Sequence, residues 1–116
     1  MSYPSNFHAK GRLKPYKMNK TEAAYDERLR YQLLAGDILW YKFGGFRVRL
    51  ADGAYYKPDF AVLTKDGFLE CHEVKGFWRE AARVRIKTAA EMYPFKFIAV
   101  KALPKKAGGG WEVEIF

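Results

Sequence analysis

Two carboxylates and a lysine interrupt otherwise apolar stretches in the middle of the chain. Asp59 stands directly before Phe-Ala-Val-Leu, and Glu73 and Lys75 close the segment 68–75. Side chains on a strand alternate between its two faces, so Glu73 and Lys75 share a face if this segment is extended. A hairpin between the two segments brings Asp59 beside that face. The sequence therefore predicts two carboxylates and one ammonium group gathered on a sheet.

This combination of groups suits a hard divalent cation. Two buried carboxylates repel each other, and each tends to take up a proton unless a cation lies between them. Magnesium prefers oxygen ligands, and it is typically held by one or two carboxylates together with phosphate oxygens of a substrate. We expect Mg²⁺, with Mn²⁺ as a substitute, and we expect Lys75 to orient water or to stabilise charge that develops in the reaction. The chemistry implied is in-line hydrolysis of a phosphodiester by water.

A helix should precede these segments. Asn19 is a suitable N-cap, Glu22 stands where a capping-box carboxylate belongs, and Gly36 suits the C-cap. From the residues alone, Glu22 is interpreted as the capping-box residue of this helix. The predicted apolar stripe of this helix consists of Tyr25, Leu29 and Leu33.

The remaining elements follow from apolar periodicity and turn residues. We predict strands over 38–43, 46–50, 55–63 and 68–75, a helix over 79–93, and strands over 95–103 and 111–116. Asp52-Gly53 and Asp66-Gly67 are typical of hairpin turns, and the Gly44-Gly45 pair is expected to lie away from the carboxylates. The fold class is therefore α/β, a single domain with a mixed central sheet flanked by helices. Its order is a helix, three or four strands, a second helix and two strands.

The charge of the chain points to a polyanionic partner. The net charge is +8, and the first twenty residues hold five of the 21 cations and no acid. We interpret 1–18 as a flexible basic arm and 19–116 as the folded domain. The charge favours nucleic acid as the partner, and a protein that is merely basic and soluble is the alternative. The second helix also carries a basic stripe, for which a solvated helix face is the alternative. The cations expected to contact nucleic acid are Lys10, Arg12 and Lys14 in the arm and Arg79, Arg83 and Lys87 in the helix.

Other classes of protein are disfavoured by composition. No apolar run approaches the roughly 20 residues that a membrane span needs, so no membrane partner is expected. The N-terminal segment lacks the apolar core of a secretory signal. The single cysteine, Cys71, excludes an internal disulfide and fits a reducing compartment, so we expect a cytoplasmic protein. His72 faces away from Glu73 and Lys75, and we expect it to have a structural role.

The segments around these residues resemble the PD-(D/E)XK nuclease superfamily. Pro58-Asp59 and Glu73-Val74-Lys75 match its signature, and about 80 residues, from Asn19 to Val100, are similar to small phage-encoded members of it. The phrases that carry the likeness are Asn19-Lys20-Thr21-Glu22, Tyr56-Lys57-Pro58-Asp59-Phe60 and His72-Glu73-Val74-Lys75-Gly76.

The resemblance implies a restriction-endonuclease-like fold and a metal-dependent DNA endonuclease. It implies Asp59, Glu73, Lys75 and Glu22 as catalytic residues and Asp59, Glu73 and Val74 as metal ligands. By analogy with resolvases of the superfamily, a homodimer acting on branched or Holliday-junction DNA in the host cytoplasm is expected. RNA as the substrate is a variant. Two other classes stay open: a nucleic-acid-binding module without catalysis, and a basic factor that binds an acidic protein.

Overall fold

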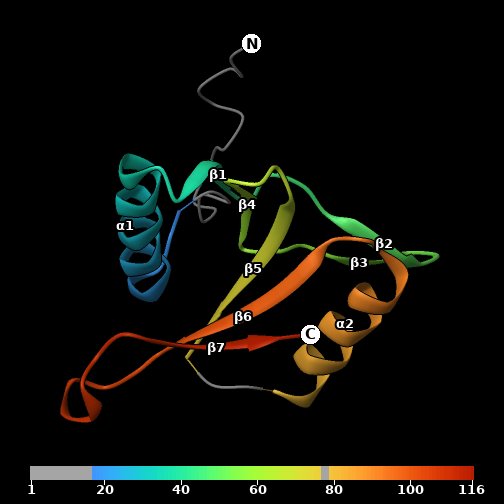
Figure 1. Cartoon of the computed structure of the whole chain (residues 1–116). Coiled ribbons are helices and arrows are strands. Elements are labelled where there is room, and N and C mark those ends of the chain that lie inside the picture. The colour runs from blue at the N-terminus through green and yellow to red at the C-terminus, as the bar shows by residue number, and fades with distance from the viewer. Residues whose placement is uncertain (1–16, 77–78) are drawn as a thin grey trace, which may run out of the picture.

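The protein is an α/β domain built on a mixed five-stranded sheet with two helices (Figure 1). The computed structural model describes residues 17–76 and 79–116. Their elements are α1 (Lys20–Ala35), β1 (Ile38–Phe43), β2 (Val48–Ala51), β3 (Ala54–Tyr56), β4 (Phe60–Thr64), β5 (Leu69–Lys75), α2 (Glu80–Met92), β6 (Lys96–Ala102), the short 3-10 helix η2 (Lys105–Ala107) and β7 (Trp111–Ile115). Most of the predicted basic arm, 1–16, lies outside the described residues.

The main sheet has the strand order β1-β4-β5-β6-β7. β1 pairs antiparallel with β4 and β4 antiparallel with β5, through the predicted turn at Asp66-Gly67. β5 and β6 run parallel, and α2 provides the crossover that a parallel pair requires. β7 returns antiparallel to β6 and forms the far edge. The prediction of a mixed central sheet is therefore confirmed.

The segment 55–63 forms two strands, and its prediction as a single strand is wrong. β3 pairs with β2 in a separate two-stranded sheet, whereas β4 belongs to the main sheet. Pro58 lies at the break, where it has no main-chain N–H to donate to a ladder. Strand β2 begins two residues later than predicted, and the Asp52-Gly53 turn joins it to β3 as expected. Five strands therefore precede α2, and three of these are in the main sheet.

Helix α1 has both predicted caps. The Asn19 side chain accepts from the Glu22 N–H at 2.8 Å, and the Glu22 carboxylate accepts from the Asn19 N–H at 3.0 Å. Gly36 ends the helix with φ 83°, a left-handed conformation that favours glycine. Leu33 is 38% exposed, so its assignment to the buried stripe is wrong. An i, i+4, i+8 pattern drifts by about 40° per step around a helix, which carries its third member away from the sheet.

Helix α2 lies within one residue of its predicted bounds at each end. Arg79 and Tyr93 flank it in extended conformations, and Ile86 and Ala89 are its buried residues. Among the described residues, neither helix combines the length and the apolar character that crossing a membrane requires.

The two helices pack on opposite faces of the main sheet. Alternation along β5 and β6 sends Val74 and Ile98 into one core and Cys71 and Phe97 into the other. The first core is completed by Tyr25 and Leu29 of α1 with Ile38, Phe60, Val62 and Val100. The second core is completed by Ile86 and Ala89 of α2 with Val48 and Tyr56 from the β2–β3 hairpin. The hairpin thus shares the α2 side of the sheet.

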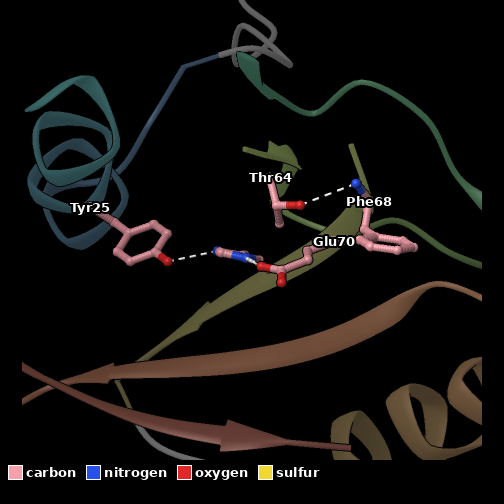
Figure 2. Close-up of polar contacts among 5 residues, drawn as sticks. Tyr25, Thr64, Phe68 and Glu70 are labelled. Atoms are coloured by element: carbon pink, nitrogen blue, oxygen red, sulfur yellow. Dashed lines mark hydrogen bonds and ion pairs between the residues drawn. The ribbon is translucent and has the colours of Figure 1, made fainter. Parts of the chain in front are cut away.

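A buried polar chain anchors α1 to the centre of the sheet. His72 Nε2 donates to Glu70 Oε1 at 2.9 Å, so its Nδ1 is left to accept from the Tyr25 hydroxyl at 2.6 Å. Figure 2 shows Tyr25 and Glu70 at the two ends of this chain. Burial raises the pKa of Tyr25 well above its usual value, which keeps the hydroxyl protonated as the donor. His72 therefore has the structural role that the sequence predicts, on the face away from Glu73.

The Tyr25–His72 bond should make a measurable contribution to stability. We expect Tyr25→Phe to lower the free energy of unfolding by about 1–3 kcal/mol, because the buried His72 nitrogen loses its partner. Urea unfolding measures this change. Tyr31→Phe is the matched control, since Tyr31 lies on the same helix and is 61% exposed. Equal stability of the two variants would contradict a role for the bond.

Candidate active site

Glu73 is a buried carboxylate held by two donors. It is 7% exposed, near the end of β5 and on the face that β5 turns toward the β2–β3 hairpin. Its Oε1 accepts from the Tyr56 hydroxyl at 2.7 Å, and its Oε2 lies 2.8 Å from Lys75 Nζ. The predicted sharing of a face by Glu73 and Lys75 is confirmed. Each carboxylate oxygen has a donor, and the carboxylate plane is fixed as a result.

Asp59 is the second carboxylate of the site. It directly precedes β4, and extending the β4–β5 register by one residue sets it opposite Glu73. Its Oδ2 accepts from the Val74 N–H at 2.9 Å. Burial, together with the negative charges of Glu73 and Glu22, raises the pKa of Asp59 to about 7, against the opposing effects of the Val74 N–H and Lys75. The structure thus brings together the predicted acids and the predicted lysine.

Glu22 acts on this site from α1. It completes the capping box through Oε1, and its charge contributes to the raised pKa of Asp59. The interpretation of Glu22 as a capping residue is confirmed, and its catalytic role, which the family resemblance implies, stays a prediction. Glu22 and Asp59 line one cleft of about 220 Å³. The other residues that line it are Lys17, Phe43, Gly44, Lys57 and Pro58.

Gly44 lies at the site, contrary to the expectation from the sequence. Its N–H donates to the main-chain oxygen of Asp59 at 2.7 Å, and it lines the cleft. The residue is buried with φ 78°, a conformation that few residues other than glycine adopt. The Gly44-Gly45 pair thus serves as the departure point of the hairpin and as a fixed donor to the Asp59 backbone.

The basic residues predicted on the second helix do not line the cleft that contains Asp59, whereas Lys17 and Lys57 do. Arg83 makes a bidentate ion pair with Glu114 of β7, at 2.7 and 3.0 Å, which offsets its charge. Arg79 and Lys87 are exposed. Their contact with nucleic acid stays a prediction. Lys10, Arg12 and Lys14 lie outside the described residues.

Cys71 and Tyr56 surround the carboxylates on the α2 side. Cys71 packs as a small apolar group, and burial raises the pKa of its thiol to about 12. Tyr56, which sequence reasoning missed, is 5% exposed and supplies a donor to Glu73. Nothing in the sequence separates it from the exposed Tyr55, because the distinction arises from the pairing of β3 with β2. Lys57 was missed too, although it adjoins Pro58-Asp59.

The residues present fit a magnesium ion. Asp59 and Glu73 offer carboxylate oxygens, and Val74, which follows Glu73 on β5 and whose N–H contacts Asp59, offers a main-chain carbonyl. Burial, and after it the negative charges of Glu73 and Glu22, raise the pKa of Asp59, and a bound cation would stabilise its charged form. Over the described ranges 17–76 and 79–116, no three His, Cys, Asp or Glu side chains form a metal-binding group. An ion held here would draw its remaining ligands from water and substrate, which is the usual habit of magnesium.

Comparisons of the chain with family models, curated proteins and solved structures give no match.

The raised pKa of Asp59 predicts that this carboxylate lowers the free energy of unfolding increasingly as the pH rises. A group whose pKa is higher in the folded state adds stability below its unfolded pKa, near 3.9, and loses that contribution as the pH rises through its folded pKa, here about 7. We expect Asp59→Asn to exceed the wild type in stability at pH 8 by on the order of 2 kcal/mol, and to match it near pH 4. Urea unfolding across this range, in chelator, measures the difference.

Glu27→Gln is the control for this titration, because Glu27 is exposed on α1 and remote from the cleft residues. A difference between Asp59→Asn and wild type that is the same at pH 4 and pH 8 would contradict the burial of an ionisable Asp59.

Proposed function

We propose that the protein is a magnesium-dependent endonuclease that hydrolyses phosphodiester bonds of DNA. The observation that carries the proposal is the convergence of Asp59, Glu73 and Lys75 at one end of the β4–β5 pair, with Glu73 held from both sides. Two carboxylates beside an ammonium group provide a cation site next to a fixed positive charge. Phosphate chemistry needs both of these, because negative charge grows on the phosphate oxygens in the transition state.

The fold also agrees with the proposed superfamily, PD-(D/E)XK. In the main sheet, β4 follows Asp59, β5 carries Glu73 and Lys75, and α2 leads to the parallel strand β6. An acidic residue, Glu22, lies on the helix that precedes the sheet. The restriction-endonuclease-like arrangement is therefore part of the proposal, with the β2–β3 hairpin as an addition between β1 and β4.

Each residue of the site has a distinct part in the proposed reaction. A magnesium ion held by Asp59, Glu73 and the Val74 carbonyl would supply Lewis-acid stabilisation of charge on the scissile phosphate. Lys75, anchored by Glu73 Oε2, holds its ammonium protons beside the phosphate, where they stabilise the developing charge. Glu22 keeps negative potential over the cleft and so favours a cation there. A water oxygen forms the new bond to phosphorus and loses a proton to bulk water, the P–O ester bond breaks, and the leaving oxygen takes a proton from bulk water.

The substrate contacts of the proposal lie at the rim of the cleft. Lys17 and Lys57 line the cleft that contains Asp59, at a position suited to the phosphates that flank the cut. Contacts of this kind recognise the backbone and carry no base sequence. A structure-selective substrate, such as branched or Holliday-junction DNA cut by a homodimer in the cytoplasm, is the form of the proposal that the superfamily resemblance favours.

A cleavage assay tests the proposed activity. We expect plasmid, linear, single-stranded or four-way-junction DNA to be cut with magnesium, and no cutting with chelator or by Asp59→Ala. Loss of the carboxylate should lower the rate by at least about 100-fold, in line with losses of about 3 kcal/mol of transition-state stabilisation. RNA molecules of the same shapes should be assayed as well, because faster cleavage of RNA would identify RNA as the substrate.

Glu27→Ala serves as the control variant for the cleavage assay, because Glu27 is an exposed acid of α1 outside the cleft. Folded wild-type protein that binds DNA but cuts nothing with magnesium or manganese would contradict the enzyme and leave a binding module. Weak binding without metal dependence would favour the protein-interaction factor.

Lys57 should contribute to DNA affinity through a phosphate contact. We expect Lys57→Ala to weaken binding uniformly across sequences and to reduce the slope of log K against log salt by about 1. Binding is measured on Asp59→Asn protein, so that cleavage does not interfere. Lys65→Ala is the matched control, an exposed lysine in the turn that follows β4 and away from the cleft. The same loss of affinity in both variants would show nonspecific charge attraction.

A further inference from the structure

The β2–β3 hairpin contacts the active site through the hydroxyl of Tyr56. Tyr56 is the last residue of β3, and its hydroxyl donates to Glu73 Oε1 at 2.7 Å from a position that is 5% exposed. The main sheet and the hairpin are separate sheets, so this bond crosses between them. Burial and the negative charge of Glu73 both raise the pKa of Tyr56 far above its usual value, so the phenol remains a donor.

The ring of Tyr56 is fixed independently of its hydroxyl. It packs in the core on the α2 side with Val48, Cys71 and Phe97, and its centroid lies 6.1 Å from that of Phe97. A phenylalanine at this position therefore retains the packing and loses only the bond to Glu73. This separation of packing from hydrogen bonding makes the role of the hydroxyl accessible to experiment.

The two donors to Glu73 act from opposite directions. Lys75 holds Oε2 from the same strand, and Tyr56 holds Oε1 from the hairpin. Without the phenol, the carboxylate is free to turn about its last side-chain bond, and Oε1 would lose its only side-chain donor in the described contacts. A carboxylate that must orient itself when the metal arrives binds that metal less tightly, because partners behind metal ligands fix their direction.

We propose that Tyr56 is a positioning residue that holds Glu73 in the orientation for binding the divalent ion, and that the β2–β3 hairpin exists in part to present it. The inference rests on the proposed metal site at Asp59 and Glu73. It assigns no contact between Tyr56 and the substrate. The hairpin thereby becomes a support of the active site, in addition to any part it has in covering the sheet.

Metal titration of Tyr56→Phe tests the proposal. We expect Mn²⁺ affinity, measured by calorimetry or by paramagnetic resonance, to fall roughly 10-fold or more. The magnesium concentration for half-maximal cleavage should rise by a similar factor, and the rate at saturating magnesium should recover most of the wild-type value. A purely structural role of Tyr56 would lower stability without shifting the metal dependence. Circular dichroism confirms that the variant is folded.

Tyr55→Phe is the matched control, because Tyr55 is the neighbouring residue of β3 and is 42% exposed with its ring against Arg47. Tight Mn²⁺ binding by wild type and by Tyr56→Phe alike would overturn the positioning role and leave the nuclease proposal standing. Failure of wild type itself to bind Mn²⁺ or Mg²⁺ would overturn both.

Discussion

Repulsion between Asp59 and Glu73 is the constraint around which the centre of this molecule is arranged. Glu73 is buried and Asp59 is half-buried at the end of the β4–β5 pair, and burial with repulsion from Glu73 raises the pKa of Asp59 to about 7. Hydrogen-bond donors offset the free-energy cost of burying the two charges. The Val74 N–H donates to Asp59, and Tyr56 and Lys75 donate to Glu73. Replacing one of these carboxylates by a neutral side chain would stabilise the fold. Retention of a destabilising pair of acids is typical of a functional site.

Separate parts of the fold position the groups of the site, and each part has an identifiable anchor. α1 is fixed to the sheet by the Tyr25–His72–Glu70 chain, which sets the position of Glu22 at the cleft. The hairpin leaves the main sheet at Gly44 and returns at Pro58, so both of its ends adjoin Asp59. The anchors on α1 and on the hairpin lie on opposite faces of β5, because successive residues of a strand alternate. The acids are therefore supported from both sides of one strand.

The sequence predicted the residues of the site better than it predicted their supports. Asp59, Glu73 and Lys75 were predictable because polar groups in apolar strands stand out, and alternation assigns them a face. The caps of α1 and the turns at Asp52-Gly53 and Asp66-Gly67 were predictable because their chemistry is local. The split of 55–63 into β3 and β4 was missed, because it depends on which strand pairs with which.

Long-range pairing explains the other omissions too. The bond from Tyr56 to Glu73 and the ion pair from Arg83 to Glu114 join residues far apart in the chain. The contact of Gly44 with Asp59 depends on where the hairpin leaves the sheet. None of these has a local pattern, so the sequence alone did not reveal the partner of Arg83, and it placed Gly44 away from the site. The drift of an i, i+4, i+8 stripe explains the exposed Leu33.

The most direct test of the central claim is the position of a bound metal. Crystals of the protein soaked in Mn²⁺ should give an anomalous peak in contact with the carboxylates of Asp59 and Glu73, at distances near 2.1–2.3 Å that are usual for such ions. The same peak should be absent from Asp59→Asn crystals. The account would be contradicted if the two carboxylates were ordered but no peak appeared beside them at saturating Mn²⁺. A Mn²⁺ ion bound only elsewhere on the chain would contradict it too.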